Sequence, residues 1–476
     1  MSLCIAGADI LTDAKARFRR GAVLIEKGRI AAIGYGDDAQ ALKTRAASTM
    51  DANGRALIPG FVNAHHHSYA NALRGTENAL PLELWALYTV AYGRNIDEKL
   101  LRLAILTGAA EMLRNGVTGV IDHSPPVRRA AASFAAHVES GMRVSFAPFF
   151  HDTHDHDLLD FDMPVALRAG VEGLGFPPAD LVADIFAQLA AADGGARVRI
   201  LLGPNAPQRC SPGLLDLWAR LRDQHGFGSH THLLETRAQA IACARHWPDG
   251  IVAEMDRRGL LDERLAVAHG VWLTPKERDL LAARGVTVVH NPASNLMLGS
   301  GILPAADLRQ RGVRMALGSD SANTGGSADP FELMRLATMI GRVGSDWESW
   351  LDAETAFAMA TEGGAAAMGL RDEIGRIETG RLADLVLVDM AGTASTEAPS
   401  IETLVRHCGP AAVRATMVGG AWVYRDGKVL AFDESAIRRE LADAAAEFRE
   451  RCAGELAIAR EAHRVFDPQL RALLGA

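Results

Sequence analysis

The sequence has few cysteines, few aromatic residues and no long apolar run. Its five cysteines are scattered over 476 residues and form no CxxC pair. An odd, dispersed set argues against a disulfide scaffold and favours reduced thiols. No apolar stretch reaches the roughly 18 residues of a membrane helix, and the first twenty residues lack the basic-then-apolar order of a signal peptide. We therefore expect a cytoplasmic protein that does not bind membranes.

The sequence also lacks an excess of positive charge. Lysine and arginine number 50 against 58 acidic residues, which gives a formal net charge of −8. A mildly acidic protein has no long-range attraction to nucleic acid, so nucleic acid is not an expected partner. No Walker or GxGxxG motif indicates a nucleotide cofactor. The hydrophobic fraction of 48% and charged fraction of 23% are typical of a globular protein with a sizeable core.

The middle of the chain, from about residue 57 to 372, alternates apolar runs with helical patterns. The runs are nearly continuous, as is typical of strands that are buried on both faces. Residues 97–116 and 274–285 have amphipathic helical patterns that end in glycine, the usual stop signal. Eight such βα units predict an α/β fold of the TIM-barrel type. The eight runs are 56–64, 117–123, 143–150, 197–204, 228–234, 265–270, 286–290 and 313–320.

Both ends of the chain are rich in short strand patterns instead. Lys27-Gly28 and Asp426-Gly427 each separate two apolar runs, which is a hairpin signal. The last residues carry a charged helical pattern. We expect a composite β-rich domain of residues 1–57 and 373–432, a barrel of residues 58–372 and a helical tail of residues 433–476.

Histidines stand at the predicted strand ends, where TIM barrels carry their chemistry. The first strand ends in PGFVNAHHHS, and side chains alternate along a strand. His65 and His67 therefore share one face, and His66 points the other way. Two imidazoles on one face can form half of a metal site. Solvated histidines at a polar strand end are the alternative.

The fifth strand, in SHTHLLETR, ends at His232 and is followed by Glu235. A histidine with a glutamate three residues later can place an imidazole on a metal and a carboxylate beside the metal-bound water. His230 has the right parity to share the face of His232. We interpret His230 as a structural histidine.

The sixth and eighth strands end in His269 and Asp320. Taken alone, the histidine could be a satisfied core residue and the aspartate a helix cap. Together with the other histidines, Asp320 completes a set of three imidazoles and one carboxylate, which suits Zn²⁺ or Fe²⁺. Such a metal lowers the pKa of bound water from about 15.7 towards 7. A carboxylate beside that water can relay its proton to a substrate.

These motifs resemble the amidohydrolase superfamily, specifically its mononuclear aminohydrolase/chlorohydrolase branch. The resemblance covers most of the chain and implies a distorted TIM (β/α)8 barrel with a small discontinuous β-sandwich built from both chain ends. Strand four, RVRILLGPNA, has no lysine, so the bridging carboxylated lysine of binuclear relatives has no counterpart. The matching pieces are PGFVNAHHH (59–67), HTHLLET (230–236), AHG (268–270), NPASNLMLGSG (291–301) and LGSD (317–320).

The resemblance also implies individual roles. One divalent metal, zinc or alternatively iron, would be bound by His65, His67, His232 and Asp320. Glu235 would carry a proton from the metal-bound water to a ring nitrogen, and His269 would polarise the substrate or the attacking hydroxide. Asp320 would take the proton of the water and help to protonate the leaving group. Relatives are often dimers or larger, so a homo-oligomer is expected.

Four further residues are candidates for contact with a planar heterocyclic substrate. Glu83 and Trp85 lie in the long segment after strand one, as a polar and an aromatic contact. Solvent exposure of Glu83 and helix packing of Trp85 are the alternatives. His151 lies nearest the end of strand three, and Gln208 after strand four could read the edge of a ring.

The sequence thus predicts a metal-dependent hydrolytic deaminase of an aromatic nitrogen heterocycle, such as a purine or pterin. No basic cluster marks a phosphate site, so we expect a free base or small heterocycle rather than a nucleotide. A chlorohydrolase of the s-triazine type is the alternative on the same scaffold. A non-catalytic barrel that serves as an assembly subunit is the third possibility, although such proteins typically lose ligands and none is missing here.

Overall fold

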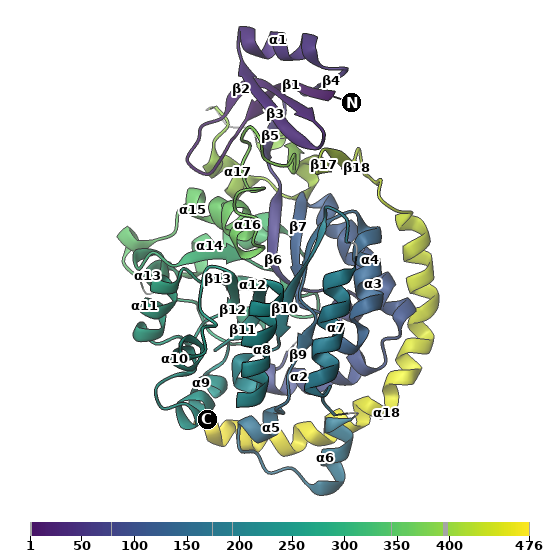
Figure 1. The fold of residues 1–476 in the computed structure, drawn as a ribbon, viewed down its shortest axis with the longest axis vertical. Coiled ribbons are helices and arrows are strands. Elements are labelled where there is room, and N and C mark those ends of the chain that lie inside the picture. The colour runs from purple at the N-terminus through teal and green to yellow at the C-terminus, as the bar shows by residue number, and fades with distance from the viewer. Residues whose placement is uncertain are drawn as a thin grey trace.

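The computed structural model describes residues 2–77, 79–173, 175–192, 194–343, 345–393 and 398–475. A barrel surrounded by helices carries a smaller sheet domain at one end (Figure 1). Both ends of the chain contribute to the smaller domain, as predicted. Within the described ranges, no helix is both long enough and apolar enough to cross a membrane.

The barrel sheet is parallel and follows the chain order. β15 (Asp320–Ser321) comes just after the eighth strand and pairs with the first, with Asp320 opposite His66, and this pairing closes the ring. The short β9 (Phe149–Phe150) extends the third strand along the fourth. The TIM-barrel prediction is confirmed. Its strands are β6 (Phe61–His67), β7 (Val117–Asp122), β8 (Arg143–Phe146), β10 (Val198–Pro204), β11 (Gly228–Leu233), β12 (Leu265–His269), β13 (Thr287–His290) and β14 (Arg314–Leu317).

The helices begin and end at the signals that the sequence carries. α3 (Glu98–Arg114) is capped by the Asp97 side chain, which accepts from the Leu100 amide. α11 (Pro275–Arg284) starts with a capping box between Thr274 and Glu277. The other helices outside the strands are α2 (Leu82–Arg94), α4 (Ala130–Ser140), α5 (Asp155–Leu158), α6 (Val165–Glu172), α7 (Ala179–Ala191), α8 (Pro212–His225), α9 (Arg237–His246), α10 (Ile251–Arg257), α12 (Pro292–Met297), α13 (Ala305–Gln310), α14 (Pro330–Ile340), α15 (Ala353–Ala358) and α16 (Gly364–Ala367).

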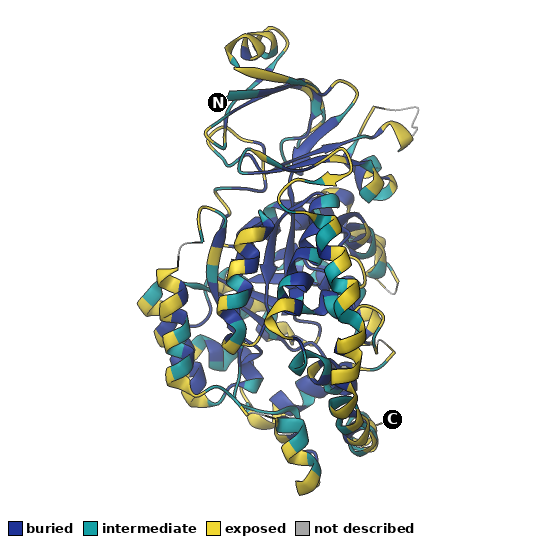
Figure 2. Cartoon of the chain, turned by 90° about the vertical axis from the view of Figure 1, so that its right-hand side faces the viewer, coloured by how far each residue is buried: buried dark blue, intermediate teal, exposed yellow. Residues whose placement is uncertain are grey.

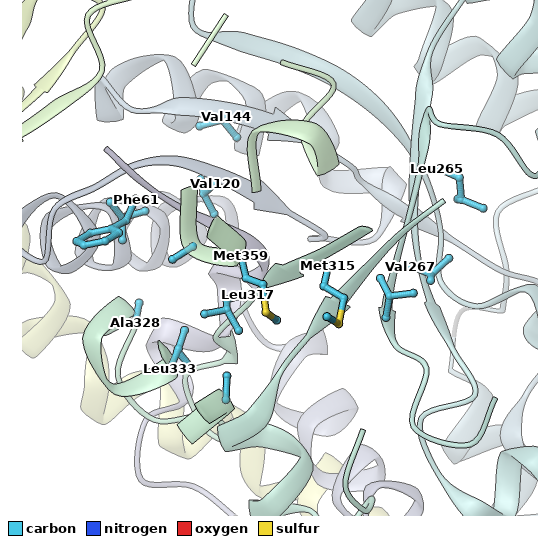
Figure 3. Close-up of a cluster of buried hydrophobic side chains, with 14 of the residues drawn as sticks. Phe61, Val120, Val144, Leu265, Val267, Met315, Leu317, Ala328, Leu333 and Met359 are labelled. Carbon is cyan, nitrogen blue, oxygen red and sulfur yellow. The ribbon is translucent and has the colours of Figure 1, made fainter. Parts of the chain in front are cut away.

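Apolar side chains fill the space between the strands and the outer helices. Phe61 of β6 packs edge-on against Phe331 and Phe357, with ring centroids 5.1 and 6.1 Å apart. Figure 3 shows this layer, in which Phe61, Val120 and Leu317 are among the labelled side chains. Figure 2 shows the strands as buried and the outward faces of the helices as exposed. A second apolar cluster, with Ala64, Ala147, Leu201, Ala266, Val289, Ala316, Met368 and Ile374, places small side chains inside the barrel.

The smaller domain is one mixed sheet of nine strands. β5 (Ala56–Pro59) pairs with β16 in this sheet, and β6 begins in the barrel after Gly60, so the chain passes between the domains at Gly60. Lys27 and Asp426 have φ values of 50° and 49° and each precedes a glycine, so both predicted hairpin turns form. The strands are β1 (Ser2–Ile10), β2 (Arg19–Glu26), β3 (Arg29–Tyr35), β4 (Ser48–Asp51), β5, β16 (Leu385–Val388), β17 (Val413–Val418), β18 (Ala421–Arg425) and β19 (Lys428–Val429), with α1 (Asp37–Arg45) and α17 (Ile401–His407) beside them.

A buried ion pair ties the barrel to the smaller domain. The Arg143 guanidinium, at the start of β8, donates to both carboxylate oxygens of Asp384 at 2.7 and 2.8 Å. The two side chains are only 3% and 1% exposed. The Gly419 amide, in the turn after β17, donates to the same carboxylate at 2.7 Å. Asp384 therefore holds three segments of the chain together.

Replacing Asp384 by Ala is expected to lower the free energy of unfolding by about 3–5 kcal/mol, because it leaves the Arg143 charge buried and unpaired. Urea unfolding followed by circular dichroism measures this change. Asp389→Ala is the matched control, since its pair with Arg414 is largely exposed and should contribute at most about 1 kcal/mol. Equal losses in the two variants would contradict the role assigned to Asp384.

The C-terminal helix α18 (Glu434–Leu474) runs from the smaller domain along the barrel to the opposite end (Figure 1). Its final turns reach the segments that follow strands one, three and five. Gln469 accepts from the Asp162 amide at 2.7 Å and donates to the Asp162 carbonyl at 3.0 Å. Phe466 and Leu470 join an apolar cluster with Leu84, Leu158, Leu159, Phe161, Ala238 and Ala242. The predicted tail is thus a packed helix that braces the loops at this end of the barrel.

Candidate active site

The residues singled out in the sequence come together at the carboxyl ends of the barrel strands. β6 supplies two histidines, β11 and β12 supply one each, and the short strand β15 supplies the aspartate. All of these side chains except that of His232 are buried, as is the glutamate after β11, and His232 is partly buried. The set comprises His65, His67, His232, Glu235, His269 and Asp320.

His67 and His232 point their Nε2 atoms towards each other. Nδ1 of His67 lies 2.5 Å from the His123 carbonyl oxygen, and Nδ1 of His232 lies 2.6 Å from the Asn205 carbonyl oxygen. A carbonyl only accepts, so each ring carries its proton on Nδ1 and leaves Nε2 as a lone pair. The two Nε2 atoms are 3.1 Å apart. Two lone pairs at this separation repel, and a cation held by both would remove the repulsion.

His65 and Asp320 complete the same cluster. Nε2 of His65 is buried, has no hydrogen-bond partner among the described groups and lies 3.5 Å from Oδ1 of Asp320. Oδ1 of Asp320 is also 3.3 Å from Nε2 of His67. Three imidazole nitrogens and one carboxylate oxygen are ligands that zinc and iron accept. The residues therefore fit a divalent metal.

The charge state of the cluster also suits a cation. Burial lowers the pKa of His65 to about 3 and holds the pKa of His232 well below its usual value, so both rings are neutral. Burial alone would raise the pKa of Asp320, but the adjacent histidines outweigh it and hold the pKa of this carboxyl well below its usual range. Ser294 donates to Oδ2 of Asp320 at 2.6 Å and fixes the carboxylate. The cluster thus combines neutral imidazoles with one anionic carboxylate.

Glu235 and His269 stand beside this cluster. Nε2 of His269 lies 3.7 Å from Oε2 of Glu235 and 3.7 Å from Oδ2 of Asp320. Nδ1 of His269 lies 2.9 Å from the Asn295 side-chain oxygen, which accepts its proton. Burial raises the pKa of Glu235 to about 7, against the opposing effect of His269. A carboxyl with a pKa near neutrality can both give and take a proton.

Three residues at the site have left-handed backbones although none is glycine. φ is 43° at Leu234, 73° at His269 and 62° at Asp320. Such conformations cost about 1–3 kcal/mol each and concentrate at functional sites. Leu234 directly precedes Glu235, so each of these residues turns the chain where a proposed catalytic side chain leaves its strand.

The four candidate substrate residues occupy different surroundings. Glu83 of α2 is buried and accepts a hydrogen bond from Thr236, the residue after Glu235. Trp85 of α2 packs against Leu82 and Leu298, and its indole nitrogen has no partner among the described groups. Contact of these two side chains with a substrate stays a prediction.

The other two candidates, His151 and Gln208, are also enclosed by the protein. Nδ1 of His151 is buried without a described partner, and its ring lies against Phe149 and Phe176. Gln208 is 1% exposed and donates to Gln239, whose side-chain oxygen also accepts from the Glu235 amide. Gln208 therefore supports the turn that carries Glu235, and its predicted contact with a ring edge is not tested.

Several residues that contact the candidate site residues were not predicted from the sequence. Ser294 bonds Asp320, Asn295 bonds His269, and Ser300 lies 3.4 Å from Oε1 of Glu235. All three belong to the segment NPASNLMLGSG, which the sequence analysis noted only as a matching motif. Its density of small polar residues just after a buried strand was the available signal.

A TIM barrel whose rim gathers three histidines and an aspartate, with Glu235 and His269 beside them, is the arrangement expected of a hydrolase with a candidate metal site. Comparison with known families agrees, since the model of the amidohydrolase family matches residues 56–423. The chain belongs to the amidohydrolase family and is a hydrolase of C–N bonds other than peptide bonds. This confirms the resemblance drawn from the motifs.

Two similar proteins have activities named after adenine nucleosides. The 5'-deoxyadenosine deaminase of Methanothermobacter thermautotrophicus is 34% identical over 94% of this chain and 98% of its own length. The 5-methylthioadenosine/S-adenosylhomocysteine deaminase of Thermococcus sibiricus is 33% identical over 82% of this chain and 86% of its own. The alignments therefore span nearly the whole of each relative.

Solved structures share the fold. An adenosine deaminase from Xanthomonas campestris with bound zinc superposes with a TM-score of 0.82 at 28% identity, covering 94% of this chain and 98% of that one. The atrazine chlorohydrolase of Arthrobacter aurescens, solved with zinc, has a TM-score of 0.82 at 21% identity, covering 93% and 100%. At that lower identity the likeness concerns the fold alone.

Proposed function

We propose that this chain is a metal-dependent hydrolytic deaminase of a purine, and more specifically of an adenine nucleoside without a 5'-phosphate. The observation that carries the proposal is the convergence of Glu235, His269 and Asp320 beside the three facing imidazoles. The names of the similar proteins support an adenine nucleoside as the substrate. The absence of a basic cluster from the sequence speaks against a nucleotide.

The metal would be held by His65, His67, His232 and Asp320. When bound, a divalent ion polarises water and lowers its pKa towards neutrality. We propose zinc, because similar proteins were solved with zinc, and keep iron as the alternative. We further propose a cytoplasmic homo-oligomer and the domain division of the sequence analysis.

The side chains of this chain move the protons of the reaction. Water adds to the ring carbon that bears the amino group, and Glu235 gives a proton to the neighbouring ring nitrogen. Asp320 accepts a proton from the adding water. His269, which Asn295 orients through Nδ1, presents Nε2 to the water and can accept a hydrogen bond from it. Asp320 then gives its proton to the amino group and ammonia leaves, while the proton of the added hydroxyl returns to Glu235 and the ring carbon keeps the oxygen as a carbonyl.

The surroundings suit a flat, largely apolar ring. Trp85, Leu82 and Leu298 form an apolar cluster on the segments that flank the site. Glu83 is linked through Thr236 to the turn of Glu235, so its carboxylate lies beside the segment that carries Glu235. A buried carboxylate there could accept a hydrogen bond from a sugar hydroxyl. Burial raises the pKa of Glu83, and a donor on the substrate would favour its charged form.

Ammonia and chloride release over one substrate panel tests this proposal. We expect ammonia from adenosine, 5'-deoxyadenosine and 5'-methylthioadenosine, and no chloride from chlorinated triazines. We expect little ammonia from AMP, because the sequence shows no basic cluster that marks a phosphate site. Free adenine, guanine and pterin complete the panel and separate nucleosides from bases. Chloride release without any deamination would establish the chlorohydrolase alternative, and no turnover by metal-loaded protein would favour a non-catalytic barrel.

A further inference from the structure

We infer that His230 is a positioning residue that fixes the ring orientation and tautomer of His65. The inference rests on the proposed function, because it concerns how His65 presents its lone pair to a metal. From its place on the strand alone, His230 is interpreted as a structural histidine. The geometry points to a specific role.

The contact between the two rings is direct and buried. Nδ1 of His65 lies 2.8 Å from Nε2 of His230, and the ring centroids are 5.0 Å apart. Both side chains are fully buried. His230 lies two residues before His232 on the same face of β11, so it sits one layer deeper in the barrel, level with His65 rather than with His67.

One proton is shared along this contact, and its position matters. If Nδ1 of His65 donates to Nε2 of His230, then Nε2 of His65 is a free lone pair beside Oδ1 of Asp320, as a metal ligand requires. If the proton instead sits on Nε2 of His65, that nitrogen can only donate to Asp320 and cannot bind a cation. An acceptor at the position of His230 selects the first arrangement.

The partner of Nδ1 in His65 is a side chain, whereas the partners of Nδ1 in His67 and in His232 are backbone carbonyls. Nδ1 of His67 and Nδ1 of His232 donate to backbone carbonyls, of His123 and Asn205, which no side-chain replacement removes. His65 alone among the three takes its partner from a side chain. In the selected arrangement His230 carries its own proton on Nδ1, an atom without a described protein partner. His230 is therefore the one orienting group of this set that a substitution can remove.

Replacing His230 by side chains of different length tests whether an acceptor at the position of Nε2 is required. Glutamine can place an amide oxygen near the position of Nε2 in His230, whereas asparagine is one methylene shorter and leucine has no acceptor. Outer-shell partners of metal-bound histidines typically contribute 10–100-fold to metal affinity. We expect zinc to bind about 10–100-fold more weakly to His230→Leu and His230→Asn than to the unaltered chain, and His230→Gln to stay within about threefold.

Zinc dissociation constants, measured by competition with a chromogenic chelator, give the readout independently of turnover. His290→Leu is the matched control, because His290 is also a buried histidine at a strand end but makes no described contact with the proposed ligands. Its zinc affinity should be unchanged. The visible spectrum of the cobalt-loaded variants reports whether the coordination geometry changes together with affinity.

The outcomes separate this inference from the proposed function. If the unaltered chain binds no zinc, the proposed function fails first. If the unaltered chain binds zinc and His230→Asn binds it as tightly as His230→Gln, the inference about His230 is overturned and the proposed function stands. Should His230→Leu not fold, the polar Asn and Gln variants, checked by circular dichroism, still decide the question.

Discussion

Replacing Glu235 by Gln is expected to lower kcat by roughly 10²–10⁴-fold, the range usual for a positioned acid–base group. Glutamine has nearly the same shape, so the contact of Ser300 and the packing of the turn should persist. It cannot carry the proton that the carboxyl transfers. Glu235 lies in the turn after β11, with its buried carboxyl beside His269. Burial raises the pKa of this carboxyl to about 7.

Two further measurements on the Glu235→Gln variant and one control variant make this result specific. Its zinc content and its thermal midpoint should equal those of the unaltered chain, so that only the chemical step is lost. Glu254→Gln on α10 makes the same chemical change at the surface and should leave kcat unchanged. A Glu235→Gln variant that retained more than a tenth of the original kcat would remove Glu235 from the proton-transfer role.

Stripping the metal with a chelator is the second large perturbation. Activity should fall to background, because the remaining residues have no other means of activating water at neutral pH. The stability should fall too, since the Nε2 atoms of His67 and His232 face each other at 3.1 Å and repel when no cation lies between them. Zinc at a hundred times its dissociation constant should restore about 2.7 kcal/mol of stability. Thermal unfolding with and without zinc measures the difference.

The ligand-bearing strand ends could be predicted because two rules act locally. Side chains alternate along a strand, which puts His65 and His67 on one face, and parallel strands direct their carboxyl ends to one rim, which gathers His232, His269 and Asp320. Local signals also predicted the glycine stops of the segments 97–116 and 274–285 and the two hairpin turns. These features depend on neighbours in the sequence.

Contacts across the barrel could not be predicted in this way. Ser294 meets Asp320 only because α12 packs against the end of the eighth strand, and His65 meets His230 across the barrel interior, 165 residues away in the sequence. The contact of Gln208 with Gln239, 31 residues further along the chain, could not be read from the sequence either. Spacing along the chain carries no information about such pairings.

For the C-terminal helix, the helix itself could be predicted from the sequence but its packing partners could not. The charged helical pattern of residues 434–466 predicted a helix, and α18 runs from Glu434 to Leu474. The pattern says that one face is buried but not against what. Packing of Phe466 and Leu470 on α2, α5 and α9 places this helix behind the segments that carry Glu83 and Glu235.

The central claim is that one divalent metal, held by His65, His67, His232 and Asp320, is required for hydrolytic release of ammonia. The most direct test titrates chelator-treated protein with zinc and follows ammonia release from 5'-deoxyadenosine. The account predicts no ammonia from the metal-free protein and a rate that rises linearly and levels off at one zinc per chain. Undiminished ammonia release from protein shown to be free of metal would contradict it.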